Sequence, residues 1–169
     1  MWNFKGHQRP AFATVPGPGQ ESVWDYPRPP VAVRDGRQVE VRDGDVLIAR
    51  TSSTWRVLET ASPPTFYIPA SDVATDLLVR AAGRSLCEWK GVASYWALAR
   101  QPGQAIAWSY ARPSAAFAAI EDCLAFYPGR VACFVDGERV RPQPGHFYGG
   151  WITAEIVGPV KGEPGTGHW

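Results

Sequence analysis

The sequence predicts a mainly β protein: a single compact domain of short antiparallel strands with one or two short helices. Three observations lead to this prediction. Among the 169 residues are 16 prolines and 17 glycines, a density that opposes long helices. Asp-Gly pairs at 35–36, 43–44 and 136–137 sit beside apolar runs, and both residues of such a pair tolerate hairpin-turn geometry. The chain also lacks the strand–helix alternation that a parallel sheet requires.

Short runs of β-branched and aromatic residues, each ended by a turn signal, predict strands in the first half of the chain. These runs cover residues 31–33, 39–42, 46–49, 55–60 and 65–68. Because they follow one another through short turns, we interpret the first four as the start of an antiparallel meander.

The segment 70–82 predicts a short helix or turn, since Ser71 and Asp72 are good N-caps. Leu77, Leu78 and Ala81 would then share one helical face, and Gly83 would end the segment.

The second half predicts further strands and one more helix. Residues 85–98 alternate as two strands hinged at Gly91, and 105–110 follow as another strand. The Ala-rich segment 113–121 predicts a short helix. Runs at 124–127 and 131–135 flank Pro128-Gly129 and read as a hairpin, with a further strand at 138–140.

Two segments rich in Pro, Gly and aromatic residues flank the predicted domain. Residues 1–30 predict an N-terminal arm, residues 31–141 the all-β domain, and residues 142–169 a C-terminal arm. Trp24 and Tyr26 favour docking of residues 21–30 onto the domain. Asp25 and Arg28, with Arg50 and Arg56 of the domain, are candidates for ion pairs that pin this arm, and exchange of arms between two copies would give a homodimer.

The composition excludes several classes of function. A net charge of +1 provides no electrostatic footprint for nucleic acid or an anionic membrane. No segment approaches the length of an apolar membrane span, and the N-terminus does not resemble a secretory signal. Three cysteines without CxxC spacing predict neither a disulfide framework nor a metal site, and they favour a cytoplasmic location. No cofactor motif is present: we find neither a phosphate loop nor GxGxxG after a strand.

The order of several residue clusters resembles a small bacterial family, domain of unknown function 427. The clusters are Val57-Leu58-Glu59-Thr60, Pro63-Pro64-Thr65-Phe66-Tyr67-Ile68-Pro69, Asp72-Val73, Cys87-Glu88-Trp89-Lys90-Gly91, Tyr95-Trp96, Trp108-Ser109-Tyr110, Pro113 and Ala125-Phe126-Tyr127. The resemblance covers about residues 31–141, and the arms look like those of a longer, cyanobacteria-type subgroup. It implies a tent-like β fold of two small coiled antiparallel sheets around an open groove.

Glu59 and Lys90 belong to the pattern of that resemblance. A carboxylate at the end of an apolar strand must be paired or protonated if it points inward, and Lys90 is a candidate partner. Such a pair would anchor a small ligand in an aromatic groove. The alternative is a solvated strand end and a solvated lysine.

Cys87 is a candidate nucleophile, since Lys90 lies close enough in sequence to favour its thiolate. No histidine is near it to act as a base, so a structural or wall-lining thiol is the preferred interpretation. Cys123 and Cys133 look like core residues.

Aromatic side chains supply the remaining site candidates, which are Tyr67, Tyr95, Trp108 and Tyr110. They can form a slot that stacks a planar or cationic ligand, or they can be a Trp-rich core.

These residues lead to three functional hypotheses. The first is a module that binds a small molecule or peptide in the aromatic groove, because aromatic density occurs here without a catalytic dyad. The second is a cytosolic hydrolase or transferase that uses Glu59, Lys90 or Cys87. The third is a structural assembly protein with exchanged arms.

Overall fold

The computed structural model describes residues 2–169, and strands dominate it. The strands are β1 (Glu21–Ser22), β2 (Val31–Asp35), β3 (Val39–Asp43), β4 (Val46–Thr51), β5 (Thr54–Leu58), β6 (Thr65–Tyr67), β7 (Leu78–Cys87), β8 (Gly91–Leu98), β9 (Ala105–Ser109), β10 (Leu124–Phe126), β11 (Ala132–Val135), β12 (Glu138–Arg139), β13 (Arg141–Pro142), β14 (Trp151–Ile152) and β15 (Ile156–Val157). The helices are short 3₁₀ segments, η1 (Val23–Asp25), η2 (Ala70–Asp72), η3 (Thr75–Leu77) and η4 (Ala115–Ile120). The prediction of a mainly β fold with little helix is confirmed.

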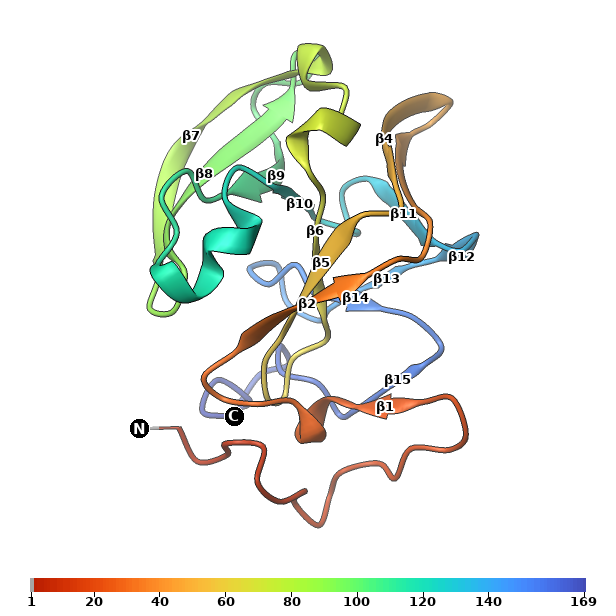
Figure 1. The fold of residues 1–169 in the computed structure, drawn as a ribbon, viewed down its shortest axis with the longest axis vertical. Helices are drawn as coiled ribbons and strands as arrows, with labels where there is room; N and C mark the ends of the chain where they lie inside the picture. The colour runs from red at the N-terminus through yellow and green to blue at the C-terminus, as the bar shows by residue number, and fades with distance from the viewer. Residues whose placement is uncertain (1) are drawn as a thin grey trace.

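The strands form small sheets, and the three largest build the body of the domain. One four-stranded sheet has the order β10-β9-β8-β7, a second has the order β12-β11-β3-β4, and a three-stranded sheet has the order β2-β5-β6. The first two lie on opposite sides in Figure 1, with the three-stranded sheet between them. All pairings inside these sheets are antiparallel, which is consistent with a tent-like β domain.

The predicted meander is wrong, because consecutive strands lie in different sheets. Among the four strands of the predicted meander, β2 to β5, only β3 and β4 pair as sequence neighbours, through the turn at Asp43-Gly44. Strand β2 pairs with β5, so Asp35-Gly36 carries the chain from one sheet to another. The physical reason is long-range burial: Val39 and Val41 of β3 are fully buried and face the core that β11 completes.

The predicted hairpin around Pro128-Gly129 is also wrong. Strand β10 pairs with β9, whereas β11 pairs with β3 and β12. Pro128-Gly129 therefore redirects the chain between two sheets. The hairpin predicted at Asp136-Gly137 does occur between β11 and β12, and both turn residues have positive φ (45° and 81°).

The short helix or turn predicted over 70–82 occurs as η2 and η3, but it ends at Leu77, because the residues from Leu78 onward belong to β7. Leu78 and the residues after it pair with β8, and this long pairing overrides a weak local helical pattern. Gly83, with a φ of +90°, lies where the β7–β8 register shifts between Arg80 and Arg84. The helix predicted at 113–121 is present as η4.

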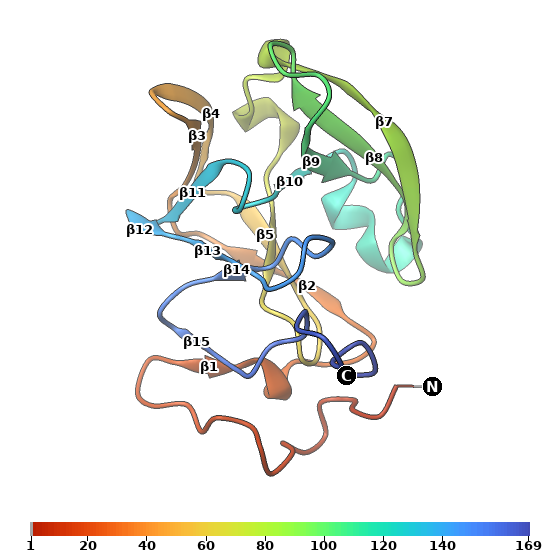
Figure 2. The ribbon, with the colours of Figure 1, turned by 180° about the vertical axis from the view of Figure 1, so that it is seen from behind.

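The two predicted arms pack against the domain and against each other. Trp24 is 1% exposed, and its ring contacts Phe4, Phe12 and Trp169 edge-on at 5.1–5.3 Å. Figure 2 shows residues 2–20 along the bottom of the molecule, with β1 beside β15 above them. Trp151 is fully buried and stacks on Phe66 in the main core. Among residues 2–169, no helix has the length and apolar character needed to cross a bilayer.

Candidate functional site

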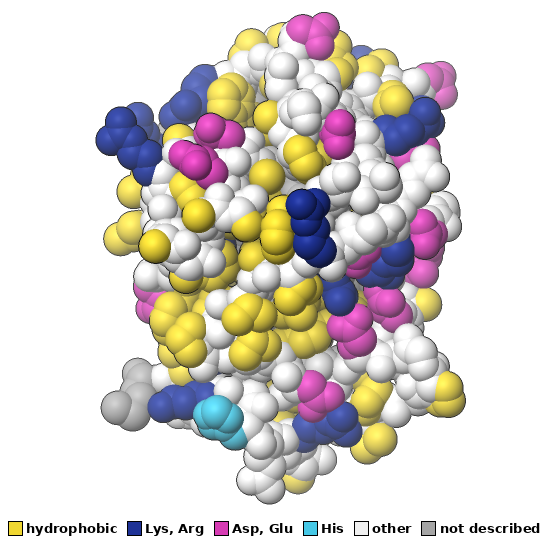
Figure 3. All heavy atoms as spheres, viewed as in Figure 1, with side chains coloured by type: hydrophobic (Ala, Val, Ile, Leu, Met, Phe, Trp, Pro, Cys, Tyr) yellow, Lys and Arg dark blue, Asp and Glu magenta, His cyan; other side chains and the backbone are white. Residues whose placement is uncertain are grey.

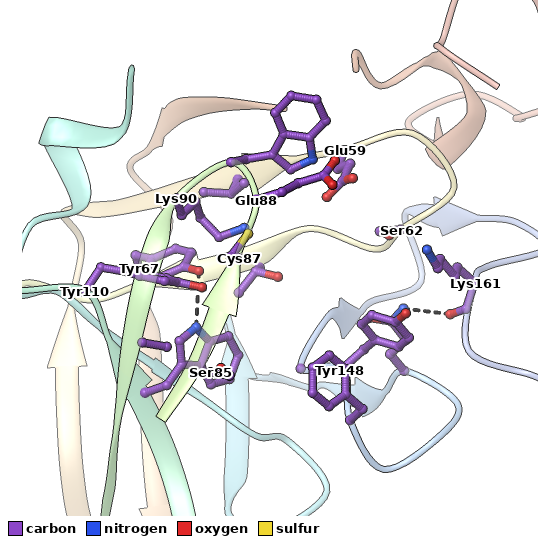
Figure 4. A pocket seen from close by; sticks show the side chains of 18 of the residues that line it. Glu59, Ser62, Tyr67, Ser85, Cys87, Glu88, Lys90, Tyr110, Tyr148 and Lys161 are labelled. Carbon is purple, nitrogen blue, oxygen red and sulfur yellow. Dashed lines mark hydrogen bonds between the residues drawn. The ribbon is translucent and has the colours of Figure 1, made fainter. Parts of the chain in front are cut away.

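A cavity of about 370 Å³ opens between the β7–β8 hairpin, strands β5 and β6, and the two terminal segments. Hydrophobic side chains gather in a band across the middle of the face in Figure 3, and Figure 4 shows the cavity from close by. Nine aromatic side chains line it, together with four charged residues and several small or polar ones. The volume falls within the usual range for small-molecule sites.

The seven residues predicted from sequence all line this cavity. They are Glu59, Tyr67, Cys87, Lys90, Tyr95, Trp108 and Tyr110. Tyr95 and Trp108 are register partners on β8 and β9, so their side chains share one face of the sheet. Residues from β5, β6, β7, β8 and β9 therefore meet at one place although they are spread along the sequence.

Two buried tyrosines form the inner wall. Trp108 Nε1 donates to the Tyr67 hydroxyl at 3.3 Å, and the Tyr67 and Tyr110 rings are 6.3 Å apart (Figure 4). Burial raises the pKa of both Tyr67 and Tyr110 above the usual value for a phenol. Both hydroxyls therefore keep their protons at neutral pH and can act as hydrogen-bond donors.

Lys90 occupies the tip of the β7–β8 hairpin and faces aromatic rings. Its Nζ lies 5.9 Å from the Tyr110 ring and 5.8 Å from the Phe117 ring. Ser114 N donates to the Lys90 carbonyl at 3.0 Å, which holds this turn in place. Gly91 follows with a φ of +112°, a conformation that a side chain would strain.

The predicted Glu59–Lys90 pair does not form, because Glu59 has another partner. Arg28 Nε lies 3.3 Å from Glu59 Oε1, and the Arg28 side chain is only 2% exposed. Arg28 also donates to the carbonyls of Phe4 (2.9 Å) and Thr60 (2.9 Å). Of the arm charges singled out in the sequence, Arg28 thus reaches the domain, whereas Asp25 binds Arg9 within its own arm.

The strands that carry most of the cavity belong to a segment that matches a known protein family. Residues 31–137 match the model of a domain of unknown function, DUF427. The chain belongs to the DUF427 family. A comparison with curated proteins gives no match. All seven predicted site residues fall within the DUF427 match.

Segments outside the DUF427 match complete the cavity, and sequence reasoning missed their residues. They are Trp2, Gln143, Phe147, Tyr148, Gly149 and Lys161. They lie in Gly/Pro-rich stretches without periodicity, so no local pattern could have oriented them. One signal was available: the chain has three lysines in all, and one of them stands in the C-terminal segment.

Cys87 lines the DUF427 cavity as a partly exposed thiol, whereas the other two cysteines are buried. All three are free. Burial raises the pKa of the Cys123 and Cys133 thiols, which fits the prediction that both are core residues. Among residues 2–169, no group of three or more His, Cys, Asp and Glu side chains is arranged to hold a metal ion.

Proposed function

We propose that this DUF427 protein is a binding module for a small molecule that has a flat apolar body and an acidic group. The observation that carries the proposal is the aromatic cavity of about 370 Å³ with a lysine that has no carboxylate partner. A peptide remains a weaker candidate, because the volume lies near the lower end of the range for ligand pockets.

Lys90 is the proposed anchor for the acidic group. Within residues 2–169 no ion pair involves Lys90, and its amine lies over the rings of Tyr110 and Phe117. An ammonium group in an aromatic setting gains from an anionic partner, because the surroundings screen charge less than water does. The protonated hydroxyls of Tyr67 and Tyr110 add donors to the same wall.

Glu59 is the proposed acceptor for a donor group of the ligand. Arg28 contacts Oε1, and within the described residues no hydrogen bond reaches Oε2. The fixed Arg28 contact holds the carboxylate in one orientation at the cavity wall. The ring of Trp108 offers a face against which a planar body can stack.

A thermal-shift screen tests the proposal with the full chain and a set of aromatic and aliphatic carboxylic acids. A ligand at about 100 times its Kd stabilises the fold by about 2.7 kcal/mol, which raises Tm by several degrees. Lys90→Met should abolish the shift, whereas Lys5→Met, the same change at an exposed lysine, should preserve it. Equal shifts in both variants, or none in the parent protein, would remove the proposal.

No specific observation favours the hypothesis of a hydrolase or transferase, and none favours exchange of the arms between two copies. Within the described chain no histidine lines the cavity beside Cys87, and the arm residues Trp24 and Tyr26 are buried within the same copy. Both stay predictions, as does a cytoplasmic location. Analytical ultracentrifugation of the full chain would test the homodimer.

A further inference from the structure

Lysine is rare in this protein, and two of its three lysines line the same cavity. Lys90 lies at the tip of the β7–β8 hairpin, Lys161 lies in the C-terminal segment, and Lys5 is exposed elsewhere. Lys161 is 5% exposed, an unusual degree of burial for a residue type that almost always reaches solvent. Burial of an amine costs free energy, so the surroundings of Lys161 must be described.

Hydrogen bonds hold both the N–H and the carbonyl of Lys161. Its N–H donates to the carbonyl of Ala61 at 2.7 Å, and its carbonyl accepts from Gln143 Nε2 at 2.6 Å (Figure 4). The amine contacts mainly aromatic rings, since Nζ lies 4.2 Å from the Trp2 ring and 5.5 Å from the Tyr148 ring. The terminal group is therefore held at the cavity wall by the fold.

Within residues 2–169 no Asp or Glu side chain forms an ion pair with the Lys161 amine. Its one hydrogen bond is a long contact of 3.5 Å to the main-chain oxygen of Trp169. The charged groups that face it are Arg28, Glu59 and Glu88. Burial and then the Arg28 guanidinium lower the pKa of Lys161, while Glu59 and Glu88 oppose this shift. The uncharged, nucleophilic form of the amine is thus favoured relative to an exposed lysine.

We propose that Lys161 is a reactive amine that captures a small aldehyde or ketone in the cavity as an imine. The inference rests on the proposed function, because the cavity must admit a small molecule. It narrows the ligand class to carbonyl compounds, with Lys90 as anchor for an acidic group elsewhere on the same molecule. Desolvated lysines in apolar surroundings are suited to this chemistry.

The reaction needs no oxidant, reductant or metal. The lone pair of Lys161 Nζ adds to the carbonyl carbon, and the carbonyl π electrons move to oxygen, which takes a proton from nitrogen to give a carbinolamine. A second proton, supplied from solvent, allows this hydroxyl to leave as water while the C=N bond forms. The product is a protonated imine that carries the single positive charge of the original ammonium ion, next to the Trp2 ring.

Reductive trapping in the intact protein tests this proposal with its own internal control. The full chain is treated at pH 7 with acetaldehyde, and separately with 4-formylbenzoate, in the presence of sodium cyanoborohydride. Peptide mass spectrometry then measures the rate of alkylation at Lys5, Lys90 and Lys161. Since burial lowers the pKa of Lys161 and so enlarges its uncharged fraction at pH 7, we expect Lys161 to be alkylated faster than Lys5.

A matched pair of ligands separates imine formation from simple binding. 4-Formylbenzoate and 4-(hydroxymethyl)benzoate share the ring and the carboxylate, but only the first has a carbonyl group. The parent protein should bind the aldehyde more tightly, and Lys161→Arg, which keeps the charge, should erase that difference and leave Lys5 alkylation unchanged.

The proposal is overturned if Lys161 of the folded parent protein is alkylated no faster than Lys5. This comparison needs no variant. If the two benzoates still raise Tm in a Lys90-dependent way, the binding function survives and only the imine fails. If neither benzoate nor any acid of the thermal-shift screen binds while Lys161 reacts selectively, the reactive amine stands and the acid-binding function fails.

Discussion

The indole ring of Trp2 covers the ammonium group of Lys161 at 4.2 Å, and thereby joins opposite ends of the sequence at the rim of the cavity. The same ring lies 4.4 Å from the Arg28 guanidinium. Its Nε1 donates to Glu88 Oε1 at 2.9 Å, so the ring also reaches the β7–β8 hairpin. Trp2 thus contacts two segments of the cavity wall, at Glu88 and Lys161, and also the arginine that pairs with Glu59.

Trp2→Ala should loosen this rim. Removal of the two cation–π contacts and the Glu88 hydrogen bond should lower the free energy of unfolding by about 1–2 kcal/mol. Any cavity ligand should also dissociate faster, which stopped-flow fluorescence measures. Trp55→Ala is the matched control, since Trp55 stacks with Arg34 at 4.8 Å outside the cavity lining. The same acceleration in both variants would contradict a rim role for Trp2.

Gly149→Ala should disturb the aromatic wall, because the added Cβ would lie 2.2 Å and 2.6 Å from carbons of the Trp108 ring. Overpacking of this kind costs about 1–3 kcal/mol, and displacement of the ring would also weaken ligand binding. Gly103→Ala adds the same methyl group with nothing within 4 Å, so it should change stability by less than about 0.5 kcal/mol. Urea denaturation of both variants measures the difference, and equal stability would show that the wall yields freely.

Arg28→Met should destabilise the fold by about 2 kcal/mol. The change leaves the Glu59 carboxylate and the carbonyls of Phe4 and Thr60 without their donor. The figure is below that of a fully buried pair because the Glu59 side chain is 22% exposed. The matched variant Arg50→Met removes an exposed ion pair with Glu40 and should cost clearly less than Arg28→Met, because water screens an exposed pair. Chemical denaturation compares them, and a smaller loss for Arg28 would contradict the proposed packing.

Tyr127 should make the protein less stable in alkali. Burial, reinforced by Tyr95 and opposed by Arg130, raises the pKa of Tyr127 to about 12. The stability linked to the neutral phenol is therefore complete below the unfolded pKa of about 10 and is lost as pH rises through the folded pKa of about 12. Between pH 8 and pH 11, the parent protein should lose about 1.4 kcal/mol more than Tyr127→Phe. Urea denaturation at the two pH values measures this loss, and parallel losses would show that Tyr127 titrates as in the unfolded chain.

Local patterns predicted the parts of this fold that depend on near neighbours. Turns at Asp43-Gly44 and Asp136-Gly137 follow from residues that accept positive φ, and strands follow from short β-branched runs. The meander and the hairpin at Pro128-Gly129 failed because strand partners are chosen by burial between distant segments. The same limit applies to the cavity: Cys87, Lys90 and Tyr95 line it as sequence clusters indicated, whereas the pairing of Glu59 with Arg28 was not predicted.

The sequence by itself determined the fold class, the family and the residue types that line the cavity. These properties depend on composition, on turn residues and on clusters whose members are close along the chain. Only the tertiary structure decided that Lys161 and Trp2 complete the cavity, because both reach it through Gly/Pro-rich segments whose course is set by contacts such as Lys161 N–H to Ala61. Such contacts join residues far apart in sequence, and no local periodicity encodes them.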